Sequence, residues 1–281
     1  MRRSLISVGV AALVVLIWPL TASAATLPPL GSAGNYAVLA GSTITNTGPT
    51  WITGKMGLSP GTSITGFPPG LSGHRDIANG AAAGAKGGLQ TAYTNAQGQT
   101  PFTTLSGNLG NRTLVAGTYR STGGLTGTLT LNGGGVYIFQ MPSTLVTASA
   151  SRVVLRNGAQ PCDVFWQVTS SATIGTATVM VGTIMAQQSI TMNTGATLNG
   201  RALALVGAVT LDTNRIIQPS GCGYGVPAFV AGPIGTTLPP TLGVPSELRG
   251  SFPWLLVIAV GAGLGATALG VNARRRRRRT A

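Results

Sequence analysis

The chain has 281 residues, of which 42 are glycine and only 8% are charged, and its formal net charge at pH 7 is +14. The low charge excludes ordinary disorder, and the glycine content argues against a helical bundle because glycine is a poor helix former. Nucleic-acid binding is not indicated, because eight of the 18 basic residues lie at the two ends (Arg2, Arg3 and Arg274 to Arg279) and no basic cluster is interleaved with aromatic residues.

Residues 1–25 are predicted to be a secretory signal peptide. Met1-Arg2-Arg3 forms a positive start, LISVGVAALVVLIWPL is the apolar region, and Ala22-Ser23-Ala24 matches a cleavage site with small residues. We expect cleavage near Ala24 or Ala25. The alternative, an uncleaved anchor, fits Pro19 and the small residues less well.

Residues 26–222 are expected to form one β-rich domain. Short segments rich in Thr, Val and Gly recur along it, and Gly, Asn-Gly or Asn-Thr-Gly separates them. Ile174, Ile190 and Val209 each follow a small or hydroxylated residue at steps of 16 and 19 residues, which suits one coil of a β-solenoid. A β-sandwich is the structural alternative. Trp166, Tyr137 and Phe139 alternate as in strands and are expected in the core.

One segment, Asp76 to Gln99, predicts a helix. It is rich in Ala and has apolar residues near helical spacing, namely Ile77, Ala81, Ala85, Leu89 and Ala92. Asp76 suits the start of a helix. Gly80, Gly84 and Gly88 repeat every four residues, so we expect them to line one face and to allow close packing along the solenoid.

The only two cysteines, Cys162 and Cys222, are predicted to form a disulfide because an exported protein meets an oxidising environment. The bridge would close a loop of about 60 residues, worth roughly 4 kcal/mol in the chain-entropy model. The alternative is two free thiols in a reducing compartment.

The C-terminal part is predicted to anchor the chain in a membrane. Residues 223–252 form a spacer rich in Pro and Gly, residues 253–272 a transmembrane helix, and residues 273–281 an Arg-rich cytoplasmic tail. The uncharged stretch from Trp254 to Val271 would make roughly 27 Å of helix. These features place the body on the extracellular side. LPPTLG at 238–243 resembles a degenerate cell-wall sorting signal, which leaves cell-wall attachment as an alternative.

No residue pattern indicates an enzyme, a metal site or a cofactor. The single histidine, His74, stands near Asp76, but a loop or helix-start role is expected for it rather than a catalytic triad. Asp76, Asp163 and Asp212 are far apart in the sequence and have no aromatic neighbours of the kind that glycoside hydrolysis would need. Ligand clusters for a metal are absent from the sequence.

Several stretches together resemble the ice-binding-like (antifreeze) proteins of the DUF3494 type. They are LGSAGNYAVLAGSTITNTGPTWITGKMGL near the start, HRDIANGAAAGAKGGLQTAY, TLVAGTYRSTGGLTGTLTLNGGGVYIFQM, and ITMNTGATLNGRALALVGAVTLDTNRI. The likeness covers nearly all of residues 30–222. It implies an all-β fold with one long helix: a discontinuous, right-handed parallel β-solenoid with the helix packed alongside.

The resemblance also implies a function, adsorption to ice through a flat face rich in Thr, Ser and Ala. Some members carry Thr-Ala/Gly-x-Thr/Asn repeats on that face. The candidate residues here are Thr47 and Thr50, Thr194 and Thr197, and, with a departure at the second residue, Thr173 and Thr176. The alternative is a structural or adhesive surface domain of the same fold that does not bind ice. Aligned Thr, Ser and Ala in several consecutive coils would favour ice binding, whereas a face interrupted by Arg112, Arg120, Arg152, Arg156 or Arg201 would favour the alternative.

Overall fold

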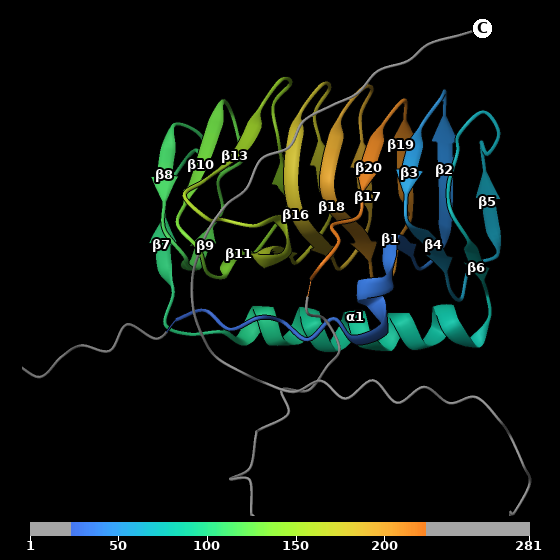
Figure 1. Ribbon diagram of the computed structural model, residues 1–281, viewed down its shortest axis with the longest axis horizontal. Helices are drawn as coiled ribbons and strands as arrows, with labels where there is room; N and C mark the ends of the chain where they lie inside the picture. Colours follow the sequence, from blue (N-terminus) through green and yellow to red (C-terminus); the bar gives the residue numbers. More distant parts are fainter. Residues whose placement is uncertain (1–23, 223–281) are drawn as a thin grey trace, which may run out of the picture. The chain divides into compact units, whose positions relative to one another are not determined.

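The computed structural model describes residues 24–222, which form a coil of short parallel strands with one long helix beside it (Figure 1). All 18 pairs of neighbouring strands in this part of the chain are parallel. The predicted β-solenoid with a helix alongside is therefore confirmed. The predicted spacer, membrane helix and Arg-rich tail, and the predicted signal peptide up to residue 23, lie outside the described residues.

The strands form three faces. The first, which we call the threonine face, is a six-stranded sheet. In spatial order its strands are β12 (Leu145–Val146), β15 (Ala172–Ile174), β17 (Ile190–Met192), β19 (Val209–Asp212), β2 (Thr43–Thr47) and β5 (Ser63–Thr65).

The second and third faces belong to one 14-stranded sheet that turns a corner. The second, called the arginine face, consists of β8 (Arg112–Leu114), β10 (Thr128–Asn132), β13 (Arg152–Arg156), the first halves of β16 (Val179–Ala186) and β18 (Thr197–Ala204), β20 (Arg215–Ile217) and β3 (Trp51–Thr53). The third, called the helix face, consists of β7 (Thr103–Leu105), β9 (Gly117–Ser121), β11 (Tyr137–Met141), β14 (Val164–Val168), the second halves of β16 and β18, β1 (Tyr36–Ala40), β4 (Lys55–Leu58) and β6 (Arg75–Ile77).

Two glycines make the corner at which β16 and β18 pass from the arginine face to the helix face. Gly182 has φ +102°, and a Cβ there would lie 2.5 Å from the Val164 carbonyl oxygen. Its partner Gly200 would bring a Cβ to 1.8 Å from the Gly182 carbonyl oxygen. Only glycine allows the two backbones to turn this closely together.

The coil is discontinuous in sequence. On the threonine face β2 lies next to β19, and on the helix face β1 lies next to β18, so the N-terminal strands stack against the last coils of the chain. Helix α1 (Gly80–Gly98) then runs the length of the helix face and returns the chain from β6 to β7 at the other end (Figure 1). At 19 residues it is about 28 Å long, close to six strand spacings of about 4.8 Å.

Helix α1 begins four residues later than Asp76. Asn79 is its N-cap and accepts a hydrogen bond from the Ala82 N–H at 2.9 Å, whereas Asp76 lies in β6. The side chains buried against the sheet are Ala82, Ala85, Leu89, Ala92, Tyr93 and Ala96. Of the apolar residues that fall near helical spacing in the sequence, Ala85, Leu89 and Ala92 are buried. Ile77 and Ala81 are exposed, because Ile77 lies in strand β6 and the cap at Asn79 sets the helix phase.

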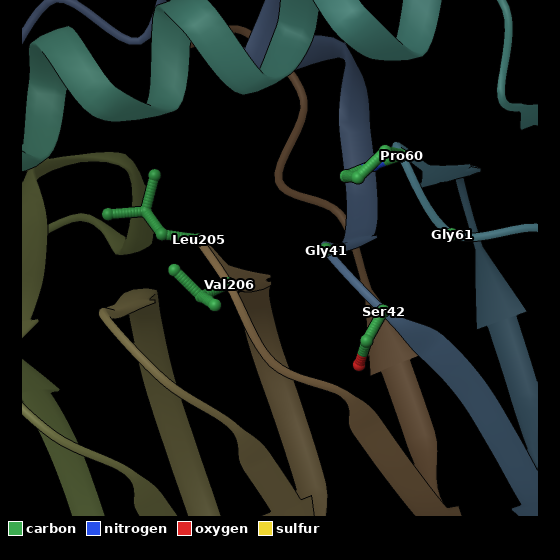
Figure 2. A pocket seen from close by; sticks show the side chains of 6 residues that line it. All are labelled: Gly41, Ser42, Pro60, Gly61, Leu205 and Val206. Atoms are coloured by element: carbon green, nitrogen blue, oxygen red, sulfur yellow. The ribbon is translucent and has the colours of Figure 1, made fainter.

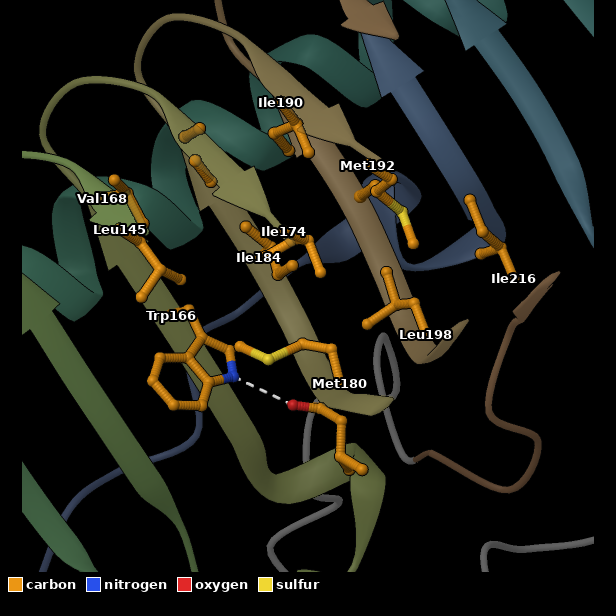
Figure 3. Close-up of a cluster of buried hydrophobic side chains, with 14 of the residues drawn as sticks. Leu145, Trp166, Val168, Ile174, Met180, Ile184, Ile190, Met192, Leu198 and Ile216 are labelled. Carbon is orange, nitrogen blue, oxygen red and sulfur yellow. Dashed lines mark hydrogen bonds between the residues drawn. The ribbon is translucent and has the colours of Figure 1, made fainter. Parts of the chain in front are cut away.

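The interior of the coil is a continuous apolar core (Figure 3). Trp166 is fully buried and stacks on Phe139, with ring centroids 4.1 Å apart, and its Nε1–H donates to the Val181 carbonyl oxygen at 2.9 Å. A second apolar cluster, including Leu89, Phe165 and Leu203, lies between the sheet and α1. The aromatic residues that alternate in the sequence are thus core residues, as predicted.

A disulfide joins Cys162 to Cys222, whose Cα atoms are 5.3 Å apart. Cys162 lies in the short 3-10 helix η2 (Pro161–Asp163), and another, η1 (Gly31–Asn35), precedes β1. Within residues 24–222 no helix is both long and apolar enough to cross a membrane.

Candidate functional site

The threonine face carries a continuous row of threonines, one from each of five neighbouring strands. In spatial order the row is Thr173, Thr191, Thr210, Thr45 and Thr65, with Val146 preceding Thr173 at one end. Each threonine is in direct register with the next, and no bulge interrupts the ladder. The methyl and hydroxyl groups therefore repeat at the strand spacing of about 4.8 Å.

The local sequence explains why these threonines point outward. Thr173, Thr191 and Thr210 each stand between two residues whose side chains pack inside the coil, in Ala172-Thr173-Ile174, Ile190-Thr191-Met192 and Val209-Thr210-Leu211. Because side chains alternate between the two sides of a strand, burying both neighbours directs the threonine to solvent. The β-branched side chain is stiff at χ1, which keeps the row regular.

A second row of small side chains lies beside the first. It contains the residues two positions earlier in the sequence: Thr43 and Ser63, which begin β2 and β5 and pair with each other, and Ser171, Ser189 and Ala208, which directly precede β15, β17 and β19. The Ser171 and Ser189 hydroxyl oxygens accept hydrogen bonds from the Ser189 and Ala208 N–H groups. Along a strand, alternate residues are about 6.7 Å apart. The face therefore presents a grid of hydroxyl and methyl groups of about 4.8 by 6.7 Å. Within it, Thr45 Oγ1 donates to Thr210 Oγ1 at 3.3 Å.

One charged group, Asp212, borders this grid, and its charge is covered by hydroxyls. Its carboxylate accepts hydrogen bonds from the hydroxyl of Thr194 and from Thr213 Oγ1, the latter at 3.0 Å. These three residues lie along the edge at which the threonine face meets the arginine face. No lysine or arginine lies on the strands of the threonine face.

The other two faces are different. Helix α1 covers the helix face, and the arginine face carries Arg112, Arg152, Arg156 and Arg215. Arg120 is in β9 on the helix face, where its guanidinium lies 3.9 Å from the ring centre of Phe102. Arg201 is buried and donates from Nε to the Gly34 carbonyl oxygen at 3.0 Å. None of the arginines named in the sequence analysis interrupts the threonine face.

The six threonines predicted from repeats do not lie together. Thr173 is in the outward row, while Thr47, Thr176 and Thr194 are exposed where their coils leave the threonine face, Thr47 and Thr194 beside Asp212. Thr197 begins β18 and faces outward on the arginine face. Thr50 is only 1% exposed, and its hydroxyl accepts a hydrogen bond from the Asn214 N–H at 3.0 Å, so it belongs to the interior.

The repeat pattern missed Thr191, Thr210, Thr45 and Thr65 for a geometric reason. Residues i and i+3 in these repeats cross the edge between two faces, whereas members of a row occupy the same position in successive coils. A signal was present in the sequence as a recurring triplet with an apolar residue before each threonine, in ATI, ITM, VTL, ITN and ITG. The predicted step from Ile174 to Ile190 is wrong by two residues, because Ile190 pairs with Ala172 and Ile174 with Met192.

Outside this face, the described residues form few groupings that could bind a metal ion or catalyse a reaction. An open hollow of about 520 Å³ is lined by Gly41, Ser42, Pro60, Gly61, Leu205 and Val206, none of which titrates (Figure 2). Residues 24–222 contain no group of three or more His, Cys, Asp or Glu side chains that could hold a metal ion. His74 Nε2 lies 3.3 Å from Asp76 Oδ1, but this carboxylate also accepts from Tyr36 Oη at 2.8 Å and Asn79 Nδ2 at 2.9 Å. The cluster joins β6, β1 and the helix start, and it contains no Ser, Thr or Cys side chain.

Comparison with known proteins identifies the family. The sequence profile described as ice-binding-like matches residues 38–217. The chain belongs to the ice-binding-like family. Among its relatives, an ice-binding protein from Nostoc sp. (strain HG1) is 47% identical over 204 residues, which is 69% of this chain and 76% of the relative. One from Flavobacterium frigoris (strain PS1) is 35% identical over 210 residues, 68% of this chain and 76% of the relative.

Solved structures of family members have the same fold. An ice-binding protein from an Antarctic biological consortium superposes with a TM-score of 0.67 at 44% identity, covering 72% of this chain and 95% of that one. An ice-binding protein from the Antarctic ascomycete Antarctomyces psychrotrophicus gives a TM-score of 0.67 at 41% identity, covering 69% of this chain and 99% of that one.

Proposed function

We propose that this family member is a non-enzymatic protein that binds ice through the threonine face, displayed on the outside of the cell. The observation that carries the proposal is the uninterrupted row from Thr173 to Thr65 across five strands. Relatives that are 47% and 35% identical over the matched residues are named ice-binding proteins, which supports the same assignment.

The physical argument rests on how the face orders water. Regularly spaced hydroxyls hold water molecules by single hydrogen bonds, while the methyl groups between them leave the neighbouring water no partner but other water. A layer ordered in this way can merge with an ice surface. A charged side chain would hold water too strongly and in the wrong geometry. Lys and Arg are absent from these strands, and the one acid, Asp212 at the end of β19, is bonded to the Thr194 and Thr213 hydroxyls, which favours this use.

Display on the cell surface is a second part of the proposal, separate from ice binding. It depends on the secretory signal in residues 1–25 and on the uncharged span with six following arginines near the C-terminus, with cell-wall attachment as the alternative. With this arrangement the protein would limit ice recrystallisation near the cell or attach the cell to ice.

The test uses residues 26–222 expressed in an oxidising compartment. Two solved relatives consist almost wholly of the matched part, with 95% and 99% of their chains covered, so this body is sufficient to fold. A single ice hemisphere is grown in a solution of the fluorescently labelled protein. We expect uptake into the ice, and we expect Thr191→Tyr or Thr210→Tyr to reduce it at least tenfold because a bulky ring interrupts the row.

Thr53→Tyr is the matched control, since Thr53 is an exposed strand threonine on the arginine face. It should leave uptake unchanged. Thr197→Tyr, on the same face, distinguishes ice binding by the threonine row from ice binding by the repeats predicted from the sequence. If Thr197→Tyr abolishes uptake and Thr191→Tyr does not, ice binding stands but the proposed face is wrong. Exclusion of the folded wild-type protein from ice would remove the function and favour a structural or adhesive domain.

A further inference from the structure

The arginine face has a row of its own that ice binding does not use. In register across the strands it runs Thr128, Arg152, Val179, Thr197, Arg215, Trp51 and Leu71. Arg156 lies four residues beyond Arg152 on the same strand. Three strand steps separate Arg152 from Arg215, or about 14 Å, and Arg156 is about 13 Å from Arg152.

These three guanidinium groups have no partner within the described body. Arg152, Arg156 and Arg215 are exposed, and none makes a hydrogen bond or ion pair with any residue between 24 and 222. The acids of this part of the chain are engaged or placed elsewhere: Asp76 is in β6, Asp163 in η2 and Asp212 at the edge of the threonine face. The arginine face therefore carries positive charge that nothing nearby neutralises.

The same row holds exposed apolar side chains. Trp51 is 61% exposed, Leu71 58% and Val179 36%. Trp51 neighbours Arg215 on one side and Leu71 on the other. Tryptophan and leucine next to unpaired arginine suit the boundary between lipid headgroups and acyl chains, where the ring is partly buried and the guanidinium meets phosphate.

We propose that the arginine face docks on the surface of a lipid bilayer rich in anionic phospholipid. The positive charge of the face attracts anionic headgroups. The exposed apolar side chains near Trp51 favour a bilayer over a soluble acidic polysaccharide, because a polysaccharide has no apolar layer in which Leu71 could be buried. The proposal does not depend on ice binding, because it uses a different face.

The experiment uses residues 26–222 and vesicles of phosphatidylglycerol or phosphatidylcholine at low ionic strength. This body contains two tryptophans, Trp51 and Trp166, and Trp166 is fully buried, so a blue shift of the emission on adding vesicles reports on Trp51. We expect the shift, and co-sedimentation, with phosphatidylglycerol vesicles and not with phosphatidylcholine vesicles. Both should weaken as salt is added.

Substitutions then test the face itself. Arg215→Gln should weaken partitioning about fivefold and Arg152→Gln with Arg215→Gln about 25-fold, from roughly 1 kcal/mol for each basic residue at an anionic surface. Lys55→Gln is the matched control, since Lys55 is an exposed strand residue at the start of β4 on the helix face. It removes the same charge and should change partitioning less than twofold.

Three results would overturn the proposal: no binding to anionic vesicles, equal losses for the Lys55 and Arg215 variants, or binding to an acidic polysaccharide such as alginate without binding to vesicles. Ice uptake measured on the same variants keeps the two functions separate. Arg152→Gln with Arg215→Gln should leave it unchanged, and Thr191→Tyr should leave vesicle binding unchanged.

Discussion

At the scale of single residues, the protein uses polar groups in two different ways. The outward threonines meet solvent in a regular row, whereas a small set of buried polar groups ties elements together. Asp76 is the clearest of these, because its carboxylate accepts hydrogen bonds from Asn79, Tyr36 and His74. The bonds from Asn79 and then from Tyr36 hold the pKa of Asp76 below its ordinary value, while burial and the bond to Asp76 raise the pKa of Tyr36 to about 12.

These shifts predict how stability changes with pH. Because the folded-state pKa of Asp76 is lowered, its contribution is complete above about pH 4 and is lost as the pH falls through the lower folded value. Tyr36 contributes below about pH 10, and its share is lost as the pH rises toward about 12. Urea unfolding across this range should show Asp76→Asn with a lower free energy of unfolding at pH 7 and a flatter acid limb. An acid limb identical to that of the wild type would show that other carboxylates control it.

Among the secondary-structure elements, helix α1 contains glycine, a poor helix former, at a position where a neighbouring backbone leaves no room for a side chain. The helix packs on the sheet through alanines, and Lys86 Nζ donates to the carbonyl oxygens of Ala204, at 2.6 Å, and Leu205. Of the three glycines expected to allow close packing, only Gly88 is closely approached. A Cβ there would lie 2.6 Å from the Leu30 carbonyl oxygen, whereas at Gly80 nothing lies within 4 Å and at Gly84 only Ser32 Oγ, at 4.0 Å.

Two adjacent glycines provide a test of this difference. Gly88→Ala should lower the free energy of unfolding by about 1–3 kcal/mol, because η1 must move away from the helix. Gly87→Ala should raise it by about 1 kcal/mol, since nothing lies within 4 Å of the added methyl group and alanine favours the helix. Chemical denaturation of the two variants measures both. Equal effects would mean that helix propensity, rather than close packing, decides both positions.

In the described body as a whole, the first and last strands along the sequence lie together in one stack. Strands β19, β18 and β20 of the last coils pair with β2, β1 and β3 of the first. The disulfide from Cys162 to Cys222 then holds the segment that follows β20. Each of the three faces is left with one role: the helix face is covered, the threonine face is regular and free of basic residues, and the arginine face carries the unpaired charge.

Removing the disulfide should weaken the fold without altering the threonine face. Cys162→Ser with Cys222→Ser should lower the free energy of unfolding by up to about 4 kcal/mol, as expected for a loop of this length. Ice uptake near 0 °C should persist, because neither cysteine lies on that face. Reductant should destabilise the wild type by a similar amount and leave the double variant unchanged. A double variant as stable as the wild type would show that strand pairing alone holds the C-terminal segment.

From the amino-acid sequence alone we could predict the composition class, the cysteine pair, and the alternation that buries Trp166 and Phe139. Family resemblance added a discontinuous solenoid with one helix. These features depend on local pattern or on likeness along the chain. The threonines that form the outward row could not be identified in this way. Thr45 and Thr210 share a hydrogen bond across 165 residues of sequence.

Which threonines align follows from the three-dimensional fold, because their register depends on β2 stacking beside β19 and on where each coil turns at its corner. The same reason separates Thr173, in the row, from Thr50, which the turn before β3 directs into the interior. It also places the arginines on one face and away from the threonines, since a difference of one residue in strand register would move every side chain to the opposite side of the sheet.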